Sequence, residues 1–275
     1  MELPPQAGRP AFTDLDRPPL VARTLARAVT ATPPWNEVHV LQAVGSTNDL
    51  VATAARGGQP EGLVVVAEHQ TGGRGRLDRQ WVSPPRAGLT FSVLLRPAVP
   101  AAVRPWVPLL LATAAAEAVS ARCDLDVSLK WPNDLLVGGR KVGGVLAEST
   151  GDAVVVGIGL NVSTRAAELP RADATSLAIE TGEVVDRVPV LLAVLRAMGP
   201  AYTTWDGTGA SAARRYRDRC DTIGRPVRVS LPGGTTLDGE ASDVDDNGCL
   251  VVRAADGTTT AVSAGDVVHV RPGEG

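Results

Sequence analysis

The chain has 275 residues, of which 44% are hydrophobic and 21% charged, and its formal net charge is −3. This length and apolar content predict a globular enzyme with one large domain and a smaller partner. The negative charge argues against nucleic-acid binding through an overall positive field and leaves room only for local basic patches.

The N-terminal segment is rich in proline and has no apolar core, which argues against a signal peptide. We expect residues 1–18 to form a disordered tail. The longest apolar stretch, residues 105–116, is too short to span a membrane and is interpreted as a buried helix. Three widely spaced cysteines and three separated histidines show no metal-ligand spacing, so we expect reduced thiols, no zinc site and a cytoplasmic location.

Hydrophobic periodicity and turn residues divide the chain up to residue 161 into helices and strands. In chain order we expect helix 20–29, strand 38–41, helix 48–56 with Ser46 or Thr47 as its N-cap, strand 63–68, loop 70–81, strand 89–95, helix 106–119, and strands 127–130, 135–137, 141–148 and 154–161. The connections between strands are too short for parallel crossovers. The sheet should therefore be mixed but mostly antiparallel, and the fold class α+β.

Two further helices, 187–204 and 211–219, are expected to cover this sheet. After Ile223 the chain changes to short apolar segments separated by glycine-containing turns, which is typical of a small β-barrel. We therefore place a large α+β domain at residues 19–222 and a C-terminal barrel domain at residues 223–275.

The loop at residues 70–81 combines glycines with arginines. Glycine lets the backbone approach a ligand closely and arginine carries a permanent positive charge, so the loop is suited to an anion. No helix pattern follows it and no Gly-Lys-Ser/Thr is present, which argues against a Rossmann or P-loop phosphate site. Taken alone, the segment is also compatible with a solvated basic loop.

Three more segments place polar residues near strand ends. Proline stops the strand in Lys130-Trp-Pro-Asn-Asp134, so its Lys, Asn and Asp side chains can project into one cleft, although such turns are often only turns. Lys141 opens the next strand, as either a substrate contact or a solvated edge charge. The last strand ends in Gly157-Ile-Gly-Leu-Asn161, and glycine inside a strand indicates that a ligand or another backbone comes close.

These segments, with Ser46-Thr47-Asn48 upstream, resemble the biotin protein ligase family in their order and spacing. The matching motifs are Gly73-Arg-Gly-Arg-x-x-Arg-x-Trp81, Lys130-Trp-Pro-Asn-Asp134, Lys141-x-Gly-Gly-x-Leu-x-Glu148 and Gly157-x-Gly-x-Asn161. Each motif is weak alone, whereas five in order are specific. The resemblance implies a core related to class II aminoacyl-tRNA synthetases and an SH3-like C-terminal domain, in agreement with the elements expected above.

The resemblance also implies roles for individual residues. It assigns biotin binding to Ser46, Thr47, Asn48, Gln70, Arg74, Arg76, Lys141 and Gly157. It assigns ATP or adenylate binding to Gly73, Arg74, Gly75, Arg76, Arg79, Trp81, Lys130, Asn133 and Asn161. The catalytic residues that it implies are Arg74, Arg76, Lys141 and Asp134, with Asp134 also expected to bind Mg²⁺.

The implied reaction has ATP and biotin as substrates. The biotin carboxylate attacks the α-phosphorus to give biotinyl-5′-AMP and pyrophosphate, and a lysine of an acceptor protein then takes the biotin. Two anions must meet in the first step, and Arg74, Arg76, Lys141 and Mg²⁺ would offset their repulsion. We expect the loop to be disordered without ligand and to exclude water from the anhydride once it orders. In the second step, we expect Asp134 to accept the lysine proton and Lys141 or Arg76 to lower that lysine's pKa by like-charge proximity.

The expected acceptor is a biotin carboxyl carrier protein or the carrier domain of a biotin-dependent carboxylase, and the expected form is a monomer or weak homodimer. Some members of the family are bifunctional ligases and DNA-binding repressors. The segment before Ser46 is too short for a winged helix-turn-helix domain, so we expect a ligase without DNA binding.

Two different functions stay open at this point. A lipoate or octanoate ligase shares the fold, although the arginine-glycine loop here follows the biotin pattern. A biotin-binding protein that has lost catalysis is disfavoured because Arg74, Lys130, Asp134 and Lys141 are all present.

Overall fold

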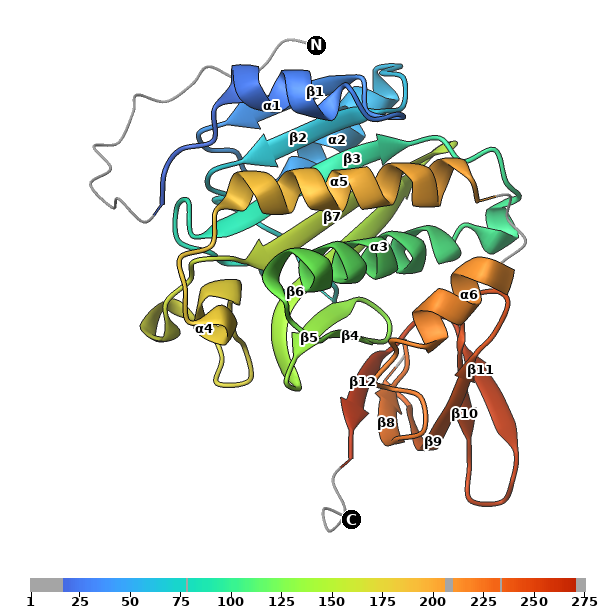
Figure 1. Cartoon of the computed structure of the whole chain (residues 1–275). Helices are drawn as coiled ribbons and strands as arrows, with labels where there is room; N and C mark the ends of the chain where they lie inside the picture. The colour runs from blue at the N-terminus through green and yellow to red at the C-terminus, as the bar shows by residue number, and fades with distance from the viewer. Residues whose placement is uncertain (1–16, 78, 206–209, 233, 271–275) are drawn as a thin grey trace.

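The computed structural model describes residues 17–77, 79–205, 210–232 and 234–270 of the chain. A seven-stranded sheet carries helices on both faces, and a five-stranded sheet follows it in the C-terminal part (Figure 1). The first part contains α1 (Ala22–Val29), β1 (Glu37–Leu41), α2 (Thr47–Arg56), β2 (Leu63–Ala67), β3 (Gly88–Leu95), η1 (Ala101–Val103), α3 (Trp106–Cys123), β4 (Val127–Lys130), β5 (Asp134–Val137), β6 (Arg140–Thr150), β7 (Ala153–Asn161), η2 (Ala166–Glu168), α4 (Leu177–Thr181), α5 (Arg187–Thr203) and α6 (Ala210–Arg217). The last part contains β8 (Pro226–Ser230), β9 (Thr236–Val244), β10 (Leu250–Arg253), β11 (Thr259–Val262) and β12 (Asp266–His269).

The large sheet has the strand order β1-β2-β3-β7-β6-β5-β4. Its neighbouring strands pair antiparallel except β1 and β2, which are parallel and are joined through α2. A parallel pair needs such a crossover, whereas the other connections can be short. The predicted α+β class with a mostly antiparallel sheet is confirmed, as are the main predicted helices and strands; α4 and the two short 3₁₀ helices were not predicted.

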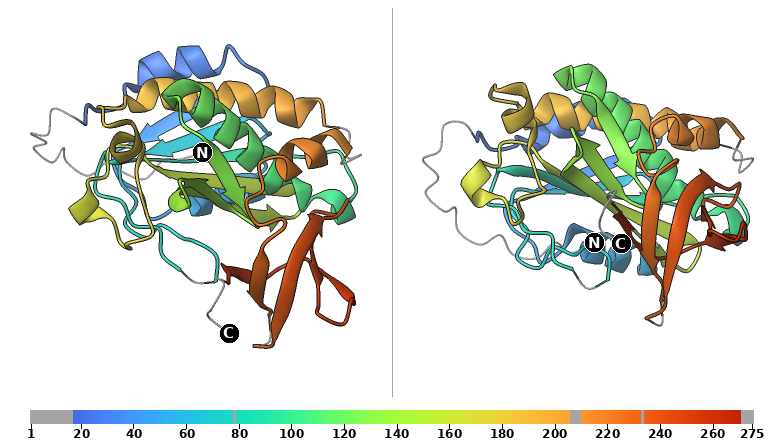
Figure 2. Two further views of the ribbon diagram at one scale, coloured as in Figure 1. Left: turned by 60° about the horizontal axis from the view of Figure 1, so that its bottom comes forward. Right: turned by 90° about the horizontal axis from the view of Figure 1, so that it is seen from below.

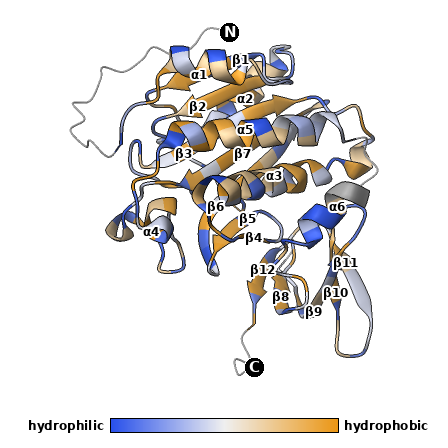
Figure 3. Ribbon diagram, viewed as in Figure 1, coloured by the Kyte–Doolittle hydropathy of each residue, from blue (hydrophilic) through white to orange (hydrophobic). Residues whose placement is uncertain are grey.

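The central strands β2 and β7 are buried along their whole length, which explains why their residues are apolar or glycine except for Asn161 at the end of β7. On β2, Val64 and Val66 belong to the core beneath α1, α3 and α5, while Leu63 and Val65 belong to a second cluster beneath α2. This alternation follows from the two-residue repeat of a strand. Figure 3 shows the strands of the large sheet coloured mostly as hydrophobic.

The apolar stretch that the sequence marks as a buried helix forms α3. Among the described residues, the helical segment 101–123 is long and apolar enough to cross a membrane. However, 67% of its most apolar 18-residue stretch is buried within the fold. It packs against α5, β4 and β6, and its apolar side chains point in all directions. Such a helix is typical of a protein core.

The C-terminal strands form one antiparallel sheet in the order β11-β10-β9-β8-β12. Its turn between β9 and β10 docks on the large domain, because the indole N–H groups of Trp106 and Trp131 donate to Asp246 O at 2.6 Å and Gly248 O at 3.1 Å. Figure 2 shows that β12 lies beside the loop that follows β2. The smaller sheet therefore reaches the same edge of the molecule as that loop.

The predicted disordered tail lies outside the described residues up to residue 16. Its last two residues are held by hydrogen bonds: Arg17 is 4% exposed and donates to Ser163 O at 2.8 Å, and O of the exposed Pro18 accepts from Arg187 at 2.6 Å. Arg187 also forms a buried ion pair with Glu68 at 2.7 Å. Two arginines that the sequence did not single out thus hold this segment against the ends of β2 and β7.

Candidate active site

One cleft of about 1200 Å³ lies between the large sheet, the loop after β2 and strand β12. It brings together residues that are far apart in the sequence. Of the residues predicted to form the site, the following line it: Ser46, Thr47, Asn48, Gln70, Arg74, Gly75, Arg76, Arg79, Trp81, Lys130, Asn133, Asp134, Lys141, Gly157 and Asn161. Gly73 is the predicted site residue that does not.

The first side of the cleft is made of neutral polar groups. We call Ser46, Thr47, Asn48 and Gln70, together with the buried Ser92 behind them, the polar wall. Thr47 donates to Gln70 Oε1 from its backbone N at 2.7 Å and from Oγ1 at 3.0 Å. Ser46 caps α2 by accepting from Asp49 N at 3.4 Å, so the expected cap role and the position in the cleft coexist.

Asn48 and Gly157 fit each other within this wall. The Asn48 amide donates to Glu148 Oε2 at 2.8 Å and to Leu146 O at 3.2 Å, and it is only 4% exposed. A Cβ added to Gly157 would lie 2.1 Å from Asn48 Oδ1. The absence of a side chain at Gly157 makes room for the Asn48 side chain, and the glycine also lines the cleft, where it was expected to let a ligand or another backbone come close.

Trp81 explains a second glycine of β7 in the same way. A Cβ on Gly159 would lie 2.4 Å from the Trp81 indole. The Trp81 ring therefore packs directly on the strand, and its Nε1 is buried with no hydrogen-bond partner in the described part of the chain. The tryptophan forms the floor of the cleft next to the loop that carries it.

Opposite the polar wall, charged residues surround one carboxylate. Lys130 and Asp134 are cross-strand partners on β4 and β5, and Lys141 Nζ lies 2.6 Å from Asp134 Oδ1. Burial lowers the pKa of Lys130, while Asp134 and Asp266 oppose that shift. Burial likewise lowers the pKa of Arg76, again against Asp266 and Asp134. Lys130 and Arg76 are thus two partly desolvated cations in the cleft.

Lys130 and Lys141 are the only lysines in the 275 residues, since arginine occupies every other basic position. An ammonium is a compact point charge that shifts its pKa readily, whereas guanidinium is a broad, planar group. Both lysines lie beside Asp134, so the cleft holds both of the chain's lysine ammonium groups. This compositional signal was available in the sequence.

The arginine loop, defined here as residues 72–77 and 79–81, folds back on itself. Trp81 N donates to Gly73 O at 2.9 Å, and Gly75 N donates to Arg79 O at 2.6 Å. A Cβ on Gly73 would lie 2.4 Å from Trp81 O, so this glycine allows the loop to close rather than approaching a ligand. Leu77, at the tip, has φ 53°.

The C-terminal sheet holds the tip of this loop. Arg76 Nη2 donates to Gly265 O at 3.3 Å, and the Arg79 guanidinium pairs with the Asp266 carboxylate. His269 also lines the cleft, and burial, together with Lys130, lowers its pKa to about 4. Asp266 and His269 were missed in the sequence because no motif marks them.

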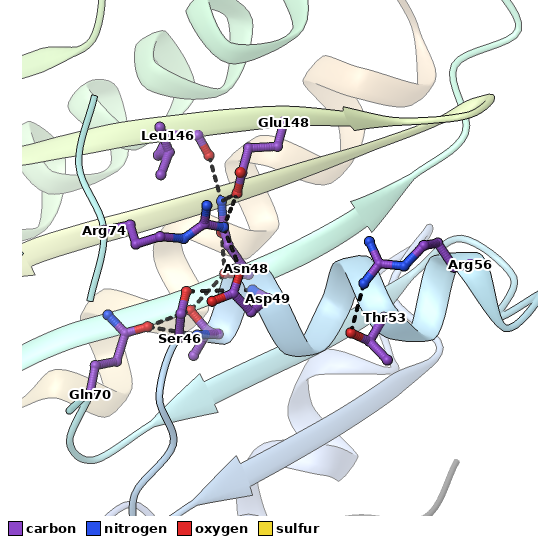
Figure 4. A network of polar contacts seen from close by, with 11 residues as sticks. Ser46, Asn48, Asp49, Thr53, Arg56, Gln70, Arg74, Leu146 and Glu148 are labelled. Carbon is purple, nitrogen blue, oxygen red and sulfur yellow. Dashed lines mark hydrogen bonds and ion pairs between the residues drawn. The ribbon is translucent and has the colours of Figure 1, made fainter. Parts of the chain in front are cut away.

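Arg74 points away from Arg76. Its Nη2 lies 2.6 Å from Glu148 Oε2 and 2.6 Å from Asp49 Oδ1, next to the start of α2 (Figure 4). The predicted pair of catalytic arginines therefore has separate partners: Arg76 bonds Gly265 O and interacts with Asp266 and Asp134, whereas Arg74 is bound by two carboxylates. Glu148, at the end of its motif, was not given a role from the sequence.

The two predicted asparagines fix backbone at the cleft's edge. Asn133 Nδ2 donates to Val145 O at 3.0 Å, and Asn161 Nδ2 donates to Thr175 O at 2.9 Å. Asn161 is 5% exposed. Both amide nitrogens are occupied, which leaves the amide oxygens as the groups that these residues can offer to a ligand.

Comparison with known proteins agrees with this site. Two family models match, the Biotin/lipoate A/B protein ligase family over residues 40–163 and the Biotin protein ligase C terminal domain over residues 222–270. The fold and site therefore define a chain of the biotin and lipoate ligase class. The chain is 42% identical over 268 residues to the biotin–[acetyl-CoA-carboxylase] ligase of Mycobacterium tuberculosis, covering 94% of this chain and 100% of that protein. It belongs to the biotin protein ligase family, as its motifs predict.

Other relatives extend the comparison. The bifunctional ligase/repressor BirA of Bacillus subtilis is 32% identical over 230 residues, which cover 80% of this chain and 70% of that protein. The structure of biotin protein ligase from Aquifex aeolicus in complex with biotin and ATP matches with a TM-score of 0.75 at 30% identity, covering 86% of this chain and 100% of that one. The biotin protein ligase of Leishmania major in complex with biotinyl-5-AMP matches with a TM-score of 0.59 at 28% identity, covering 84% and 100%.

Proposed function

We propose that this chain is a biotin–[acetyl-CoA-carboxylase] ligase, which forms biotinyl-5′-AMP from biotin and ATP and transfers the biotin to a lysine of a carboxylase carrier domain. The observation that carries the proposal is the cleft itself, where a neutral polar wall faces Arg76, Lys130 and Lys141. A neutral wall suits an uncharged ring system with many hydrogen-bonding groups. The cations suit the carboxylate and the phosphates that must meet beside it.

In the first step a biotin carboxylate oxygen bonds to the α-phosphorus, and the bond from that phosphorus to the bridging oxygen of pyrophosphate breaks. Negative charge builds on the phosphoryl oxygens as this happens. Arg76 and Lys141, already partly removed from water, require little reorganisation to stabilise that charge. Most of the rate enhancement then comes from positioning and electrostatics.

Asp134 fits a role in magnesium binding. Among the described residues, no three His, Cys, Asp or Glu side chains gather into a metal site. Mg²⁺ uses one or two carboxylates and completes its shell with phosphate oxygens and water, so a single cleft carboxylate is a suitable donor. We propose Asp134 as the protein ligand for Mg²⁺ that accompanies ATP, where the ion would offset phosphate charge.

In the second step the neutral amine of the acceptor lysine attacks the acyl carbon, AMP leaves, and the nitrogen loses a proton. An ammonium that enters beside Lys130 and Lys141 experiences like charges, which lower its pKa. Asp134, between those two lysines, lies where it can accept the proton. Replacing Asp134 by Asn tests this role: transfer from preformed biotinyl-5′-AMP at the full rate, with adenylation impaired, would leave Asp134 only the metal role.

Pyrophosphate release, measured separately with biotin, lipoate and octanoate in the presence of ATP and Mg²⁺, tests the substrate. We expect pyrophosphate release above background with biotin but not with lipoate or octanoate. We also expect the mass of an added carrier domain to increase by one biotin. Faster release with lipoate or octanoate would assign the chain to the other branch of its class.

We further propose that the protein acts in the cytoplasm, as a monomer or weak homodimer, without DNA or membrane as partner. The relative matched over its whole length has the name of a ligase alone, which supports the absence of DNA binding. The three cysteines are free thiols in the structure, which supports a reducing compartment. Specific, biotin-dependent retardation of promoter DNA in a gel-shift assay would contradict the proposed absence of DNA binding.

A further inference from the structure

Glu148, near the end of β6, joins two parts of the site without lining the cleft. Its Oε2 accepts from Asn48 Nδ2 at 2.8 Å and from Arg74 Nη2 at 2.6 Å (Figure 4). One carboxylate oxygen therefore connects the first turn of α2 with the beginning of the arginine loop. Because Glu148 lies behind the cleft, it acts through these residues rather than on a substrate.

The connection continues into the polar wall. Ser92 Oγ is fully buried and lies 2.6 Å from Asn48 Oδ1 and 2.7 Å from Thr47 Oγ1. Thr47 in turn holds Gln70. An unbroken series of hydrogen bonds thus runs from Gln70 to Glu148 and ends at Arg74.

Arg74 has two acidic partners with different surroundings. Asp49 is 61% exposed, whereas Glu148 is 31% exposed and is also bound to the buried Asn48. Exposed ion pairs contribute little, while a hydrogen-bonded charge held in a network contributes more. Glu148 is therefore the partner that fixes the position of Arg74.

We propose that Glu148 is a positioning residue, which anchors the Arg74 end of the arginine loop to the polar wall and so retains biotinyl-5′-AMP in the cleft until transfer. This rests on the proposed function. The two arginines then have separate tasks, since Arg76 meets the phosphates and Arg74 holds the loop in place.

Loss of the anchor has a chemical consequence that can be measured. Free biotinyl-5′-AMP is an acylating reagent: the amine of any lysine can attack its acyl carbon, the bond to the phosphate oxygen breaks, AMP leaves and water takes the proton. The enzyme contributes little background, because Lys130 and Lys141 are its only lysines. An unrelated lysine-rich protein added to the assay therefore captures what escapes.

The experiment compares the wild type with Glu148→Gln, Asp49→Asn and Asp152→Asn. Asp152 pairs with Arg96 at the turn after β6 and serves as the matched control, because it lies outside the cleft. We expect Glu148→Gln to raise the release rate of preformed biotinyl-5′-AMP about tenfold and to biotinylate the added protein, with its melting temperature unchanged. Asp49→Asn should have a smaller effect and Asp152→Asn none.

Tryptic cleavage after Arg74, Arg76 or Arg79, measured without ligand, reports the same anchor independently of the substrate. We expect faster cleavage in Glu148→Gln than in Asp152→Asn. If biotin caused no pyrophosphate release from ATP, the proposed function would be wrong, but the cleavage rate would still test whether Glu148 holds the arginine loop in place. Glu148→Asp, which keeps the charge with a shorter reach, replaces Glu148→Gln if the latter does not fold. Release and cleavage rates equal to those of the control would overturn the proposal.

Discussion

The two sides of the cleft are built in opposite ways. The polar wall consists of neutral groups on strands and a helix, and Thr47, Asn48 and Ser92 are each less than 5% exposed. The arginine loop is held by charges in contact with water, since the Arg74 and Arg79 side chains are 41% and 55% exposed. Buried neutral hydrogen bonds keep one geometry at any ionic strength, whereas exposed ion pairs weaken with salt. We therefore expect the polar wall to be the rigid side and the arginine loop the adjustable side of the cleft.

The largest expected effect concerns the support of the rigid side. Arg187→Met leaves Glu68 buried without its partner, and Glu68 lies two residues before Gln70. Loss of one member of a buried ion pair lowers the free energy of unfolding by about 3–5 kcal/mol. Urea unfolding measures it. Arg215→Met, which breaks an exposed pair with Glu117, is the control and should change stability by less than about 1 kcal/mol; equal losses in both variants would refute the difference.

The next largest effect concerns chemistry on the adjustable side. Arg76→Ala removes a half-buried cation of the cleft that we propose to stabilise phosphate charge, and should lower kcat/KM for pyrophosphate release by about 10²–10³-fold. Arg171→Ala serves as control, because that arginine also lines the cleft but is 63% exposed and paired with Asp173. A fall of less than tenfold in Arg76→Ala would remove Arg76 from the catalytic step.

Steric fit tests the rigid side again. Gly157→Ala places a methyl group 2.1 Å from Asn48 Oδ1, so the wall must deform. Overpacking of this kind lowers stability by about 1–3 kcal/mol, and we also expect KM for biotin to rise. Gly57→Ala, at the end of α2, meets its nearest atom at an ordinary 3.4 Å and should be neutral. Unchanged KM and stability in Gly157→Ala would show that the polar wall accommodates the added methyl group and is not rigid.

Low pH should lower the stability of the protein through His269 on β12. The pKa of His269 is about 4 in the folded protein against 6.5 for the unfolded side chain. Between these pH values the unfolded chain binds a proton that the folded chain does not. The contribution of neutral His269 to the free energy of unfolding is therefore complete above pH 6.5 and is lost as the pH falls toward 4. Relative to His269→Gln, the wild type should therefore lose about 2 kcal/mol between pH 7 and pH 5. Parallel stability curves for the two proteins would contradict this.

The smallest effect concerns the tip of the loop. Asp266→Asn removes the partner of Arg79, and an exposed pair contributes at most about 1 kcal/mol. We expect KM for ATP to rise less than about fivefold, and the difference from wild type to vanish at high salt. If the difference in KM for ATP persisted in 1 M KCl, salt would not screen the Arg79–Asp266 ion pair. The arginine loop would then be as rigid as the polar wall.

The sequence predicted the helices and strands beneath the polar wall well, because periodicity and caps determine local structure, but it did not mark Ser92, which joins Thr47 to Asn48. Ser46 as the cap of α2 and the strands around Lys130 to Asp134 follow from such local rules. The direction of individual side chains in the loop did not follow. Arg74 and Arg76 are two residues apart, yet the turn that begins at Gly75 sends them to different partners.

The contribution of the C-terminal sheet could not be read from the sequence either. Asp266 and His269 reach the cleft only because the turn after β9 docks on the large domain. Such docking depends on contacts between residues more than a hundred positions apart, and no short motif records it. The same holds for Arg17 and Arg187, whose partners lie at distant strand ends.

The tryptophans give this chain optical reporters of its own. Trp106 and Trp131 donate their indole N–H groups to the docked turn of the C-terminal sheet, and Trp81 lies in the cleft. The emission of an indole depends on the polarity and hydrogen bonding around it. Separation of the two sheets and occupation of the cleft therefore each alter the fluorescence of a different tryptophan, and single Trp→Phe replacements make it possible to follow both events in an unlabelled enzyme.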